Sequence, residues 1–151
     1  MGFGRLEGIM ESAIRMDASE IIETIIGCAY RVHNELGSGF LEKVYENAMA
    51  LELAESGLRV KQQEPVPVYF RQKIVGEYFA DLLVEDRILV ELKAVRSIIS
   101  EHEVQLVNYL TATGKEDGLL INFSSSVQVK RKYRQYRPGK TSTTSGQETH
   151  E

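Results

Sequence analysis

Apolar residues in the first third of the chain recur every three or four positions, the spacing of an α-helix with one buried face. This pattern predicts a helix over residues 18–36 that stops at Gly37, and a second helix over residues 40–56 that stops at Gly57. The apolar face of the first helix comprises Ile22, Ile25, Ile26, Ala29, Val32 and Leu36. We expect these faces to pack against a second layer of structure.

After Gly57 the pattern changes to alternating apolar and polar residues, the period of a half-buried β-strand. A third helix is predicted over residues 100–113, where Ser100-x-x-Glu103 has the spacing of a capping box. Pro65 and Pro67 favour an edge position or a bend for the first strand. The predicted strands cover residues 59–69, 74–84, 88–94, 118–123 and 127–133, the last also fitting a mixed strand–helix segment.

The order of these elements, ααβββαββ, predicts an α/β fold in which helices flank a mixed central sheet. The first three strands are expected to form an antiparallel meander, and the nearly all-apolar strand over residues 118–123 is typical of one buried on both faces. We interpret residues 18–137 as one domain. An N-terminal extension over residues 1–17 precedes it, and a polar, disordered tail over residues 138–151 follows it.

The composition of the 151 residues is that of a soluble globular protein, with 42% hydrophobic and 26% charged residues. No apolar run approaches the roughly 20 residues that span a membrane, and the N-terminus has no signal-peptide pattern. The single cysteine, Cys28, cannot form an internal disulfide, so the cytoplasm is the expected location. A net charge of −4 argues against an extended DNA-coating surface, but it is compatible with a local basic groove.

Two carboxylates and a lysine gather on the hairpin predicted over residues 80–93. With residues 85–87 as its turn, Asp81 lies directly opposite Glu91, and their Cβ atoms are roughly 5 Å apart. Lys93 shares their face because side chains in a strand alternate. The two carboxylates would repel each other, and a divalent cation between them would remove the repulsion. A shift of one residue in the register would separate them.

An Asp followed about ten residues later by Glu-x-Lys resembles the PD-(D/E)xK signature of metal-dependent nucleases, with Ala80 in place of the proline. The GxxExxY motif, which names one family of this superfamily, and the QxxxY motif match at Gly39, Glu42, Tyr45, Gln105 and Tyr109. The three motifs follow the expected order, so the chain is identified as a GxxExxY-type member of the PD-(D/E)xK nuclease superfamily. The resemblance implies a restriction-endonuclease-like fold.

The resemblance also implies roles for these residues. Mg²⁺ or Mn²⁺ would be bound by hard oxygen ligands. The implied ligands are Asp81, Glu91, Glu42 and the main-chain carbonyl of Leu92. Lys93 would orient or deprotonate the attacking water and offset the phosphate charge. The alternative is a solvated hairpin in which Glu91 and Lys93 form a surface pair.

Glu42 and Tyr45 each have a simpler structural explanation. With Gly39 as N-cap, Glu42 would be the third residue of its helix, where a carboxylate interacts favourably with the helix dipole. The resemblance instead directs Glu42 towards the site, and the two roles are compatible. Tyr45 lies one turn further on, where packing in the core with a bonded hydroxyl is the expected role.

Gln105 and Tyr109 share one face of the third helix with His102. In the resembled proteins this face lies beside the hairpin, where the glutamine orients the catalytic water or contacts the nucleic-acid backbone. We therefore count Gln105 with the catalytic residues and Tyr109 with the nucleic-acid contacts, while an ordinary polar stripe is the alternative. His102 fits either a phosphate contact or a solvated helix start. His33 has the setting of a hydrogen-bonded boundary histidine.

A basic run near the C-terminus alternates with Tyr133 and Tyr136. It contains Lys130, Arg131, Lys132, Arg134, Arg137 and Lys140. Such a run can hold a nucleic-acid backbone while the tyrosines stack on bases, and a solubilising surface is the alternative.

The expected function is metal-dependent hydrolysis of phosphodiester bonds in DNA, by an endo- or exonuclease. One alternative is a nuclease-fold module that binds DNA or a partner protein without cleaving. Another is a scaffold that forms homo-oligomers through the apolar faces of the first two helices. The intact set of Asp81, Glu91 and Lys93 favours the enzyme, because a decayed site usually loses one of them.

Overall fold

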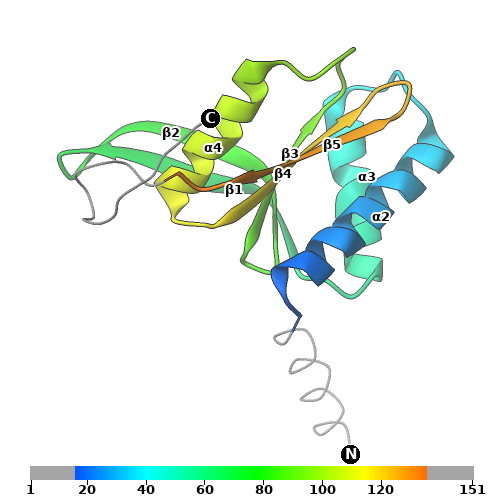
Figure 1. Cartoon of the computed structure of the whole chain (residues 1–151), viewed down its shortest axis with the longest axis horizontal. Helices are drawn as coiled ribbons and strands as arrows, with labels where there is room; N and C mark the ends of the chain where they lie inside the picture. The colour runs from blue at the N-terminus through cyan, green and yellow to red at the C-terminus, as the bar shows by residue number, and fades with distance from the viewer. Residues whose placement is uncertain (1–15, 136–151) are drawn as a thin grey trace, which may run out of the picture.

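The fold is described for residues 16–135 in a computed structural model, which contains three helices and five strands in that range (Figure 1). The helices are α2 (Ala18–Leu36), α3 (Glu42–Glu55) and α4 (Ser100–Thr113). The strands are β1 (Val60–Phe70), β2 (Lys73–Val84), β3 (Ile88–Lys93), β4 (Asp117–Phe123) and β5 (Val127–Tyr133). The predicted bounds of these elements agree with the observed ones within two residues. The predicted extension and tail lie almost wholly outside the described residues.

The five strands form one sheet in the order β1-β2-β3-β4-β5. Strands β1 to β3 are an antiparallel meander, β4 runs parallel to β3, and β5 is antiparallel to β4. Helix α4 makes the crossover that a parallel pair requires. The predicted mixed α/β sheet flanked by helices is therefore confirmed.

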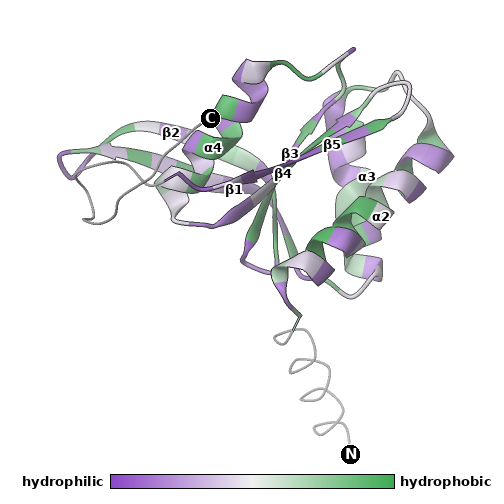
Figure 2. Cartoon of the chain, in the orientation of Figure 1, coloured by the Kyte–Doolittle hydropathy of each residue, from purple (hydrophilic) through white to green (hydrophobic). Residues whose placement is uncertain are grey.

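The sheet has a separate hydrophobic core on each face. Figure 1 shows α2 and α3 on one face and α4 on the other. The larger core contains Ile21, Ile25 and Met49 from the helices, and the smaller core contains Leu106 and Leu110 from α4. Figure 2 shows α2 banded with hydrophobic and hydrophilic residues, as a helix with one buried face requires. Each fully buried Leu or Ile stabilises the fold by about 1.5–3 kcal/mol.

Strand β4 contributes to both cores, as its apolar sequence predicts. Leu119 and Ile121 pack in the core beside α2 and α3, whereas Leu120 packs in the core beside α4. Gly118 allows α4 to approach closely, because a Cβ at this position would lie 3.0 Å from the Leu106 side chain.

The alternation of side chains in β1 and β2 reverses at one point. Val60 packs against the core beside α2 and α3, yet Val66, six residues along the same strand, belongs to the core beside α4. Strand β2 shows the same change between Leu82 and Ala80. Between these pairs lies Gln63, whose φ of 55° is in the left-handed region that non-glycine residues rarely occupy. The outer half of the β1–β2 hairpin is therefore turned over relative to the inner half.

Helix ends differ from the prediction in their N-caps. The N-cap of α3 is Leu41, so Glu42 is the first helical residue, and the predicted cap at Gly39 is wrong. The N-cap of α4 is Ile99 because Ser100 is already helical, so the predicted Ser100 capping box is also wrong. The C-terminal ends agree, since α2 stops at Gly37 with φ 73°. Within residues 16–135, none of the helices has the length and apolarity that a membrane span requires.

Candidate active site

Asp81 and Glu91 meet where β2 and β3 diverge. The β2–β3 ladder pairs Leu82 with Val90, Leu83 with Leu89 and Val84 with Ile88. Continuing this register places Asp81 opposite Glu91, as predicted. The main-chain amide of Asp81 donates to Oε2 of Glu91 at 3.1 Å, and the amide of Leu92 donates to Oδ2 of Asp81 at 2.8 Å. The two carboxylates therefore share one patch, each bonded to the strand that carries the other.

Burial raises the free energy of ionising this carboxylate pair. Glu91 is only 7% exposed, and its burial, followed by the negative charge of Asp81, raises its pKa from 4.5 to about 8. Burial also raises the pKa of Asp81, while the hydrogen bond from Leu92 opposes that shift. At neutral pH the pair therefore retains a proton, and a cation that binds there must displace it.

The pair has the chemistry of a magnesium or manganese site. No three Asp, Glu, His or Cys side chains converge as a metal centre anywhere in residues 16–135. Mg²⁺ does not need such a cage, because proteins usually hold it through one or two carboxylates together with water and substrate oxygens. Asp81 and Glu91 fit that requirement. The carbonyl of Leu92 remains a predicted third ligand.

Lys93 lies at the end of β3, two residues beyond Glu91, and is half-buried. Its positive charge lowers the pKa of Glu91, which opposes the larger effects of burial and of Asp81. Among the described residues, no carboxylate lies within ion-pair distance of its ammonium group. The alternative of a solvated Glu91–Lys93 surface pair is therefore wrong.

Glu46, a buried glutamate of α3, has a stronger electrostatic effect on Asp81 than Glu42, the residue predicted as a ligand. Glu46 is 4% exposed, whereas Glu42 is exposed at the first position of the helix. Both negative charges raise the pKa of Asp81, and Glu46 does so more strongly. Glu42 and Glu46 share one face of α3, but Glu42 lies at the exposed start of the helix, whereas Glu46 lies one turn further on, where this face is buried. A direct role for Glu42 as a ligand stays a prediction.

Two neighbouring glutamines hold Glu46 in place. Gln62 Nε2 donates to Oε2 of Glu46 at 2.8 Å, and Gln63 Nε2 donates to Oε1 at 2.9 Å. Lys43 adds an ion pair to Oε2 at 3.1 Å. The Gln63 side chain also lies close enough to the Asp81 carboxylate to lower its pKa. Gln63 therefore links α3 to the carboxylate pair.

Tyr45 of the GxxExxY motif has the structural role expected of it. Its hydroxyl donates to the carbonyl of Gly37 at 2.6 Å, and its ring stacks on Phe123 with centroids 4.5 Å apart. The ring is fully buried. The motif therefore secures the α2–α3 connection through its tyrosine.

The QxxxY face of α4 lies beside the pair. Gln105 Nε2 donates to the hydroxyl of Tyr109 at 3.0 Å. Burial raises the pKa of Tyr109 to about 12, and the charges of Glu91 and Asp81 act in the same direction. The hydroxyl is thus within electrostatic reach of the carboxylates. The predicted placement of this face is confirmed, while its catalytic role remains a prediction.

Both histidines of the described chain have structural partners. Nδ1 of His102 accepts a hydrogen bond of 3.3 Å from the amide of Ile99, so this ring caps α4. Nε2 of His33 lies 2.9 Å from the carbonyl of Ser124, and the ring stacks on Phe123. His33 is the hydrogen-bonded boundary histidine that its position predicts.

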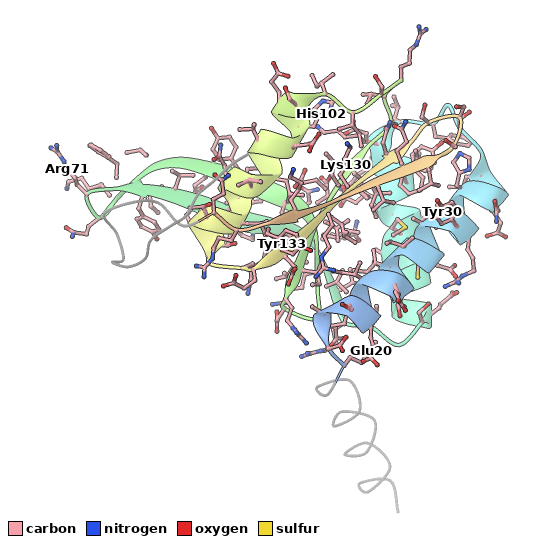
Figure 3. All side chains as sticks on the ribbon, in the orientation of Figure 1. Glu20, Tyr30, Arg71, His102, Lys130 and Tyr133 are labelled. Atoms are coloured by element: carbon pink, nitrogen blue, oxygen red, sulfur yellow. The ribbon has the colours of Figure 1, made fainter. Side chains whose placement is uncertain are left out.

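Three of the six residues of the basic run lie on the edge strand β5, where Figure 3 labels Lys130. Within the described residues, ion pairs join Arg131 to Asp117 at 3.0 Å, Lys132 to Glu103 at 2.9 Å, and Arg134 to Glu116. Lys130 is exposed beside them. Because alternate residues of a strand face opposite sides, the run does not form one continuous basic face. Arg137 and Lys140 lie outside the described residues.

Glu46, Gln62 and Gln63 were not identified from the sequence. Glu46 follows Glu42 by four residues and so shares its helix face, which is the one signal that could have indicated it. A left-handed glutamine within a strand has no sequence signature, because such backbone conformations are imposed by tertiary contacts.

One family model and two solved structures are similar to this chain. The family model described as the PD-(D/E)XK nuclease superfamily matches residues 19–135. A search among curated proteins finds no match. Among solved structures, a protein named SSO0001 is similar at 14% identity and a TM-score of 0.44, with 87% of this chain and 76% of that chain covered. An alkaline exonuclease, LHK-Exo from Laribacter hongkongensis, is similar at 15% identity and a TM-score of 0.41, with 79% and 71% covered.

The match of the family model extends over most of the chain and includes the hairpin that carries Asp81, Glu91 and Lys93. On this evidence the chain belongs to the PD-(D/E)XK nuclease superfamily.

Proposed function

We propose that the chain is a GxxExxY-type, Mg²⁺- or Mn²⁺-dependent nuclease that hydrolyses phosphodiester bonds in DNA. The observation that supports this most strongly is the pair formed by half-buried Asp81 and buried Glu91, where strands β2 and β3 separate. Folding brings two carboxylates together at a cost in free energy, and the pair has no partner of opposite charge at ion-pair distance in residues 16–135. A cation-binding function accounts for that cost.

Each residue of the site has a distinct part in this reaction. When a divalent ion is bound, it polarises the phosphate and lowers the pKa of a water molecule. Asp81 and Glu91 would hold the ion, and Glu91 would lose its proton to water on binding it. Lys93 offsets the negative charge that develops on the phosphate, since its ammonium group is not held by a salt bridge within the described residues. The hydrogen-bonded pair of Gln105 and Tyr109 orients the substrate beside them.

The test is cleavage of labelled single- and double-stranded DNA and RNA by the purified protein, with Mg²⁺, Mn²⁺ or EDTA. We expect cleavage of DNA with either ion and none in EDTA. Asp81→Asn should abolish turnover. Asp86→Asn is the matched control, because Asp86 lies in the turn of the same hairpin and makes only surface ion pairs. It should cleave like wild type.

An inert wild-type protein with every ion and substrate would contradict the proposal. If that protein still bound DNA, the non-cleaving module would replace the nuclease as the function. Equal activity of Asp81→Asn and wild type would place the chemistry elsewhere in the chain.

A further inference from the structure

A groove of about 1360 Å³ lies between the outer half of the β1–β2 hairpin and α4. Figure 1 shows this part of the hairpin projecting past α4. The hairpin wall carries Val68, Tyr69 and Tyr78, and the helix wall carries Gln105, Asn108 and Tyr109. The groove exists because the hairpin is turned over at Gln63, which directs the Tyr78 side of β2 towards α4.

The walls of the groove combine flat aromatic rings with amides. Tyr78 is 49% exposed, and the centroid of its ring lies 5.7 Å from that of Tyr109. Tyr69 is also exposed on the same wall. Gln105 and Asn108 present side-chain amides from the helix, one turn apart at most. Aromatic faces that stack on a base, next to amides that bond its polar edge, are the chemistry by which proteins hold unpaired nucleobases.

Tyr109 borders both the groove and the carboxylate pair. Gln105 and Tyr109 line the groove, and the hydroxyl of Tyr109 is within electrostatic reach of Glu91 and Asp81. A strand whose scissile phosphate lies at the pair would therefore place a neighbouring nucleotide beside Tyr78. In a closed duplex that base is stacked within the helix and cannot enter.

The hairpin itself favours a nucleic-acid strand over an added protein strand. Pro65 and Pro67 remove amide donors from β1, the edge strand, and so oppose β-strand addition there. Its tip carries the exposed residues Arg71 and Lys73, and Figure 3 shows Arg71 pointing away from the body of the protein. These cations can contact phosphates of a strand that leaves the groove.

We propose that this groove binds an unpaired nucleobase of the substrate strand, stacked on Tyr78, and that the protein therefore prefers single-stranded or frayed ends to closed duplex. The preference in cleavage rests on the proposed nuclease function. The binding of the base does not require turnover.

Base binding is tested in EDTA, where no cleavage occurs, with single-stranded DNA that carries one 2-aminopurine. Stacking on an aromatic ring quenches this base, and loss of one stacking contact lowers affinity roughly 5- to 150-fold. Tyr78→Ala should lose the quenching and at least fivefold in affinity, whereas Tyr78→Phe should keep both. Phe79→Ala is the matched control, because Phe79 is 51% exposed on the opposite face of the same strand and should bind like wild type.

Three results would overturn the proposal. The first is equal affinity and quenching in Tyr78→Ala and wild type, and the second is equal affinity of the wild type for a closed duplex and for the single strand. The third is a change of oligomeric state in Tyr78→Ala on light scattering without any change in DNA binding. The last result would make the groove a contact between two copies of the chain. Failure of the nuclease function is measured separately, as an absence of DNA cleavage by the wild-type protein with Mg²⁺ or Mn²⁺.

Asn108→Ala, a substitution at an exposed helix position, provides a second test if Tyr78→Ala lowers the melting temperature. It should lower affinity for the single strand without altering the fold.

Discussion

The side-chain amide of Gln63 donates a hydrogen bond of 2.9 Å to Oε1 of Glu46 and so joins β1 to α3. This glutamine holds a left-handed backbone conformation, with φ 55°, within a strand. Strain of this kind costs about 1–3 kcal/mol and persists where surrounding contacts impose it. Because the Gln63 side chain also lowers the pKa of Asp81, we expect this conformation to hold the side chain beside the site.

Two substitutions of Gln63 should distinguish the effect of its backbone conformation on stability from the effect of its side-chain hydrogen bonding. Gln63→Ala keeps the strain and loses the hydrogen bond to Glu46, whereas Gln63→Gly loses this bond but relieves the strain. We expect Gln63→Gly to be more stable than Gln63→Ala by about 1 kcal/mol in urea unfolding. Both should bind Mn²⁺ more weakly than wild type in calorimetry. Gln62→Ala is the control, since it loses one bond to Glu46 without a change in backbone strain. If Gln62→Ala bound Mn²⁺ as weakly as Gln63→Gly does, the special role of Gln63 would be contradicted.

Stability without metal should fall as the pH rises. The pKa of Glu91 is 4.5 unperturbed and about 8 in the folded protein, so between these values the folded state holds a proton that the unfolded state has released. The free energy of unfolding therefore decreases with pH across this window. Glu91→Gln should flatten the profile. The measurement is urea unfolding in EDTA at several pH values between 5 and 8, and an equally steep fall in Glu91→Gln would assign the effect to another group.

Mg²⁺ or Mn²⁺ should raise the melting temperature, by an amount that grows with ion concentration, because the ion binds only the folded state. Asp81→Asn should lose most of this response, while its metal-free form should be as stable as wild type or more so. Glu42→Gln tests the predicted fourth ligand. Because Glu42 is exposed, we expect it to keep most of the response. A response lost equally in both variants would make Glu42 a direct ligand.

Much of this fold and site could be predicted from local patterns. The bounds of α2 and α4 follow from helical periodicity and from Gly37 and Gly114, and the facing of Asp81 and Glu91 follows from a three-residue turn. These features depend on residues close together in the sequence, so the period and the turn determine them.

The remaining features depend on contacts between distant segments. Glu46 is buried because β1 supplies Gln62 and Gln63 to bond it, sixteen and seventeen residues away. The basic run is partly neutralised because α4 places Glu103 against Lys132, at a separation of 29 residues. The periodicity of apolar residues does not predict such contacts between distant residues.

The salt dependence of DNA binding should distinguish Lys130 from Lys132. Each lysine that contacts a phosphate releases counterions, so its removal lowers the slope of binding against salt by about 1. Lys130 is exposed, whereas Lys132 is paired with Glu103 at 2.9 Å. We therefore expect Lys130→Ala to lower the slope by about 1 and Lys132→Ala to lower it less. Equal slopes in Lys130→Ala and wild type would make the run a solvated surface.

Lys93 should affect turnover rather than binding. Its ammonium group lies beside the carboxylate pair, and within residues 16–135 no carboxylate fixes it in an ion pair, so it can follow the charge that develops on a reacting phosphate. Lys93→Ala should therefore keep most of the DNA affinity and lower kcat at least 100-fold, with KM little changed. Lys61→Ala is the control, because Lys61 is exposed and pairs with Asp86 at the surface. The readouts are DNA binding by anisotropy in EDTA and cleavage kinetics with Mg²⁺. A loss of affinity as large as the loss of kcat would show that Lys93 holds the substrate in its ground state, and would remove it from the chemical step.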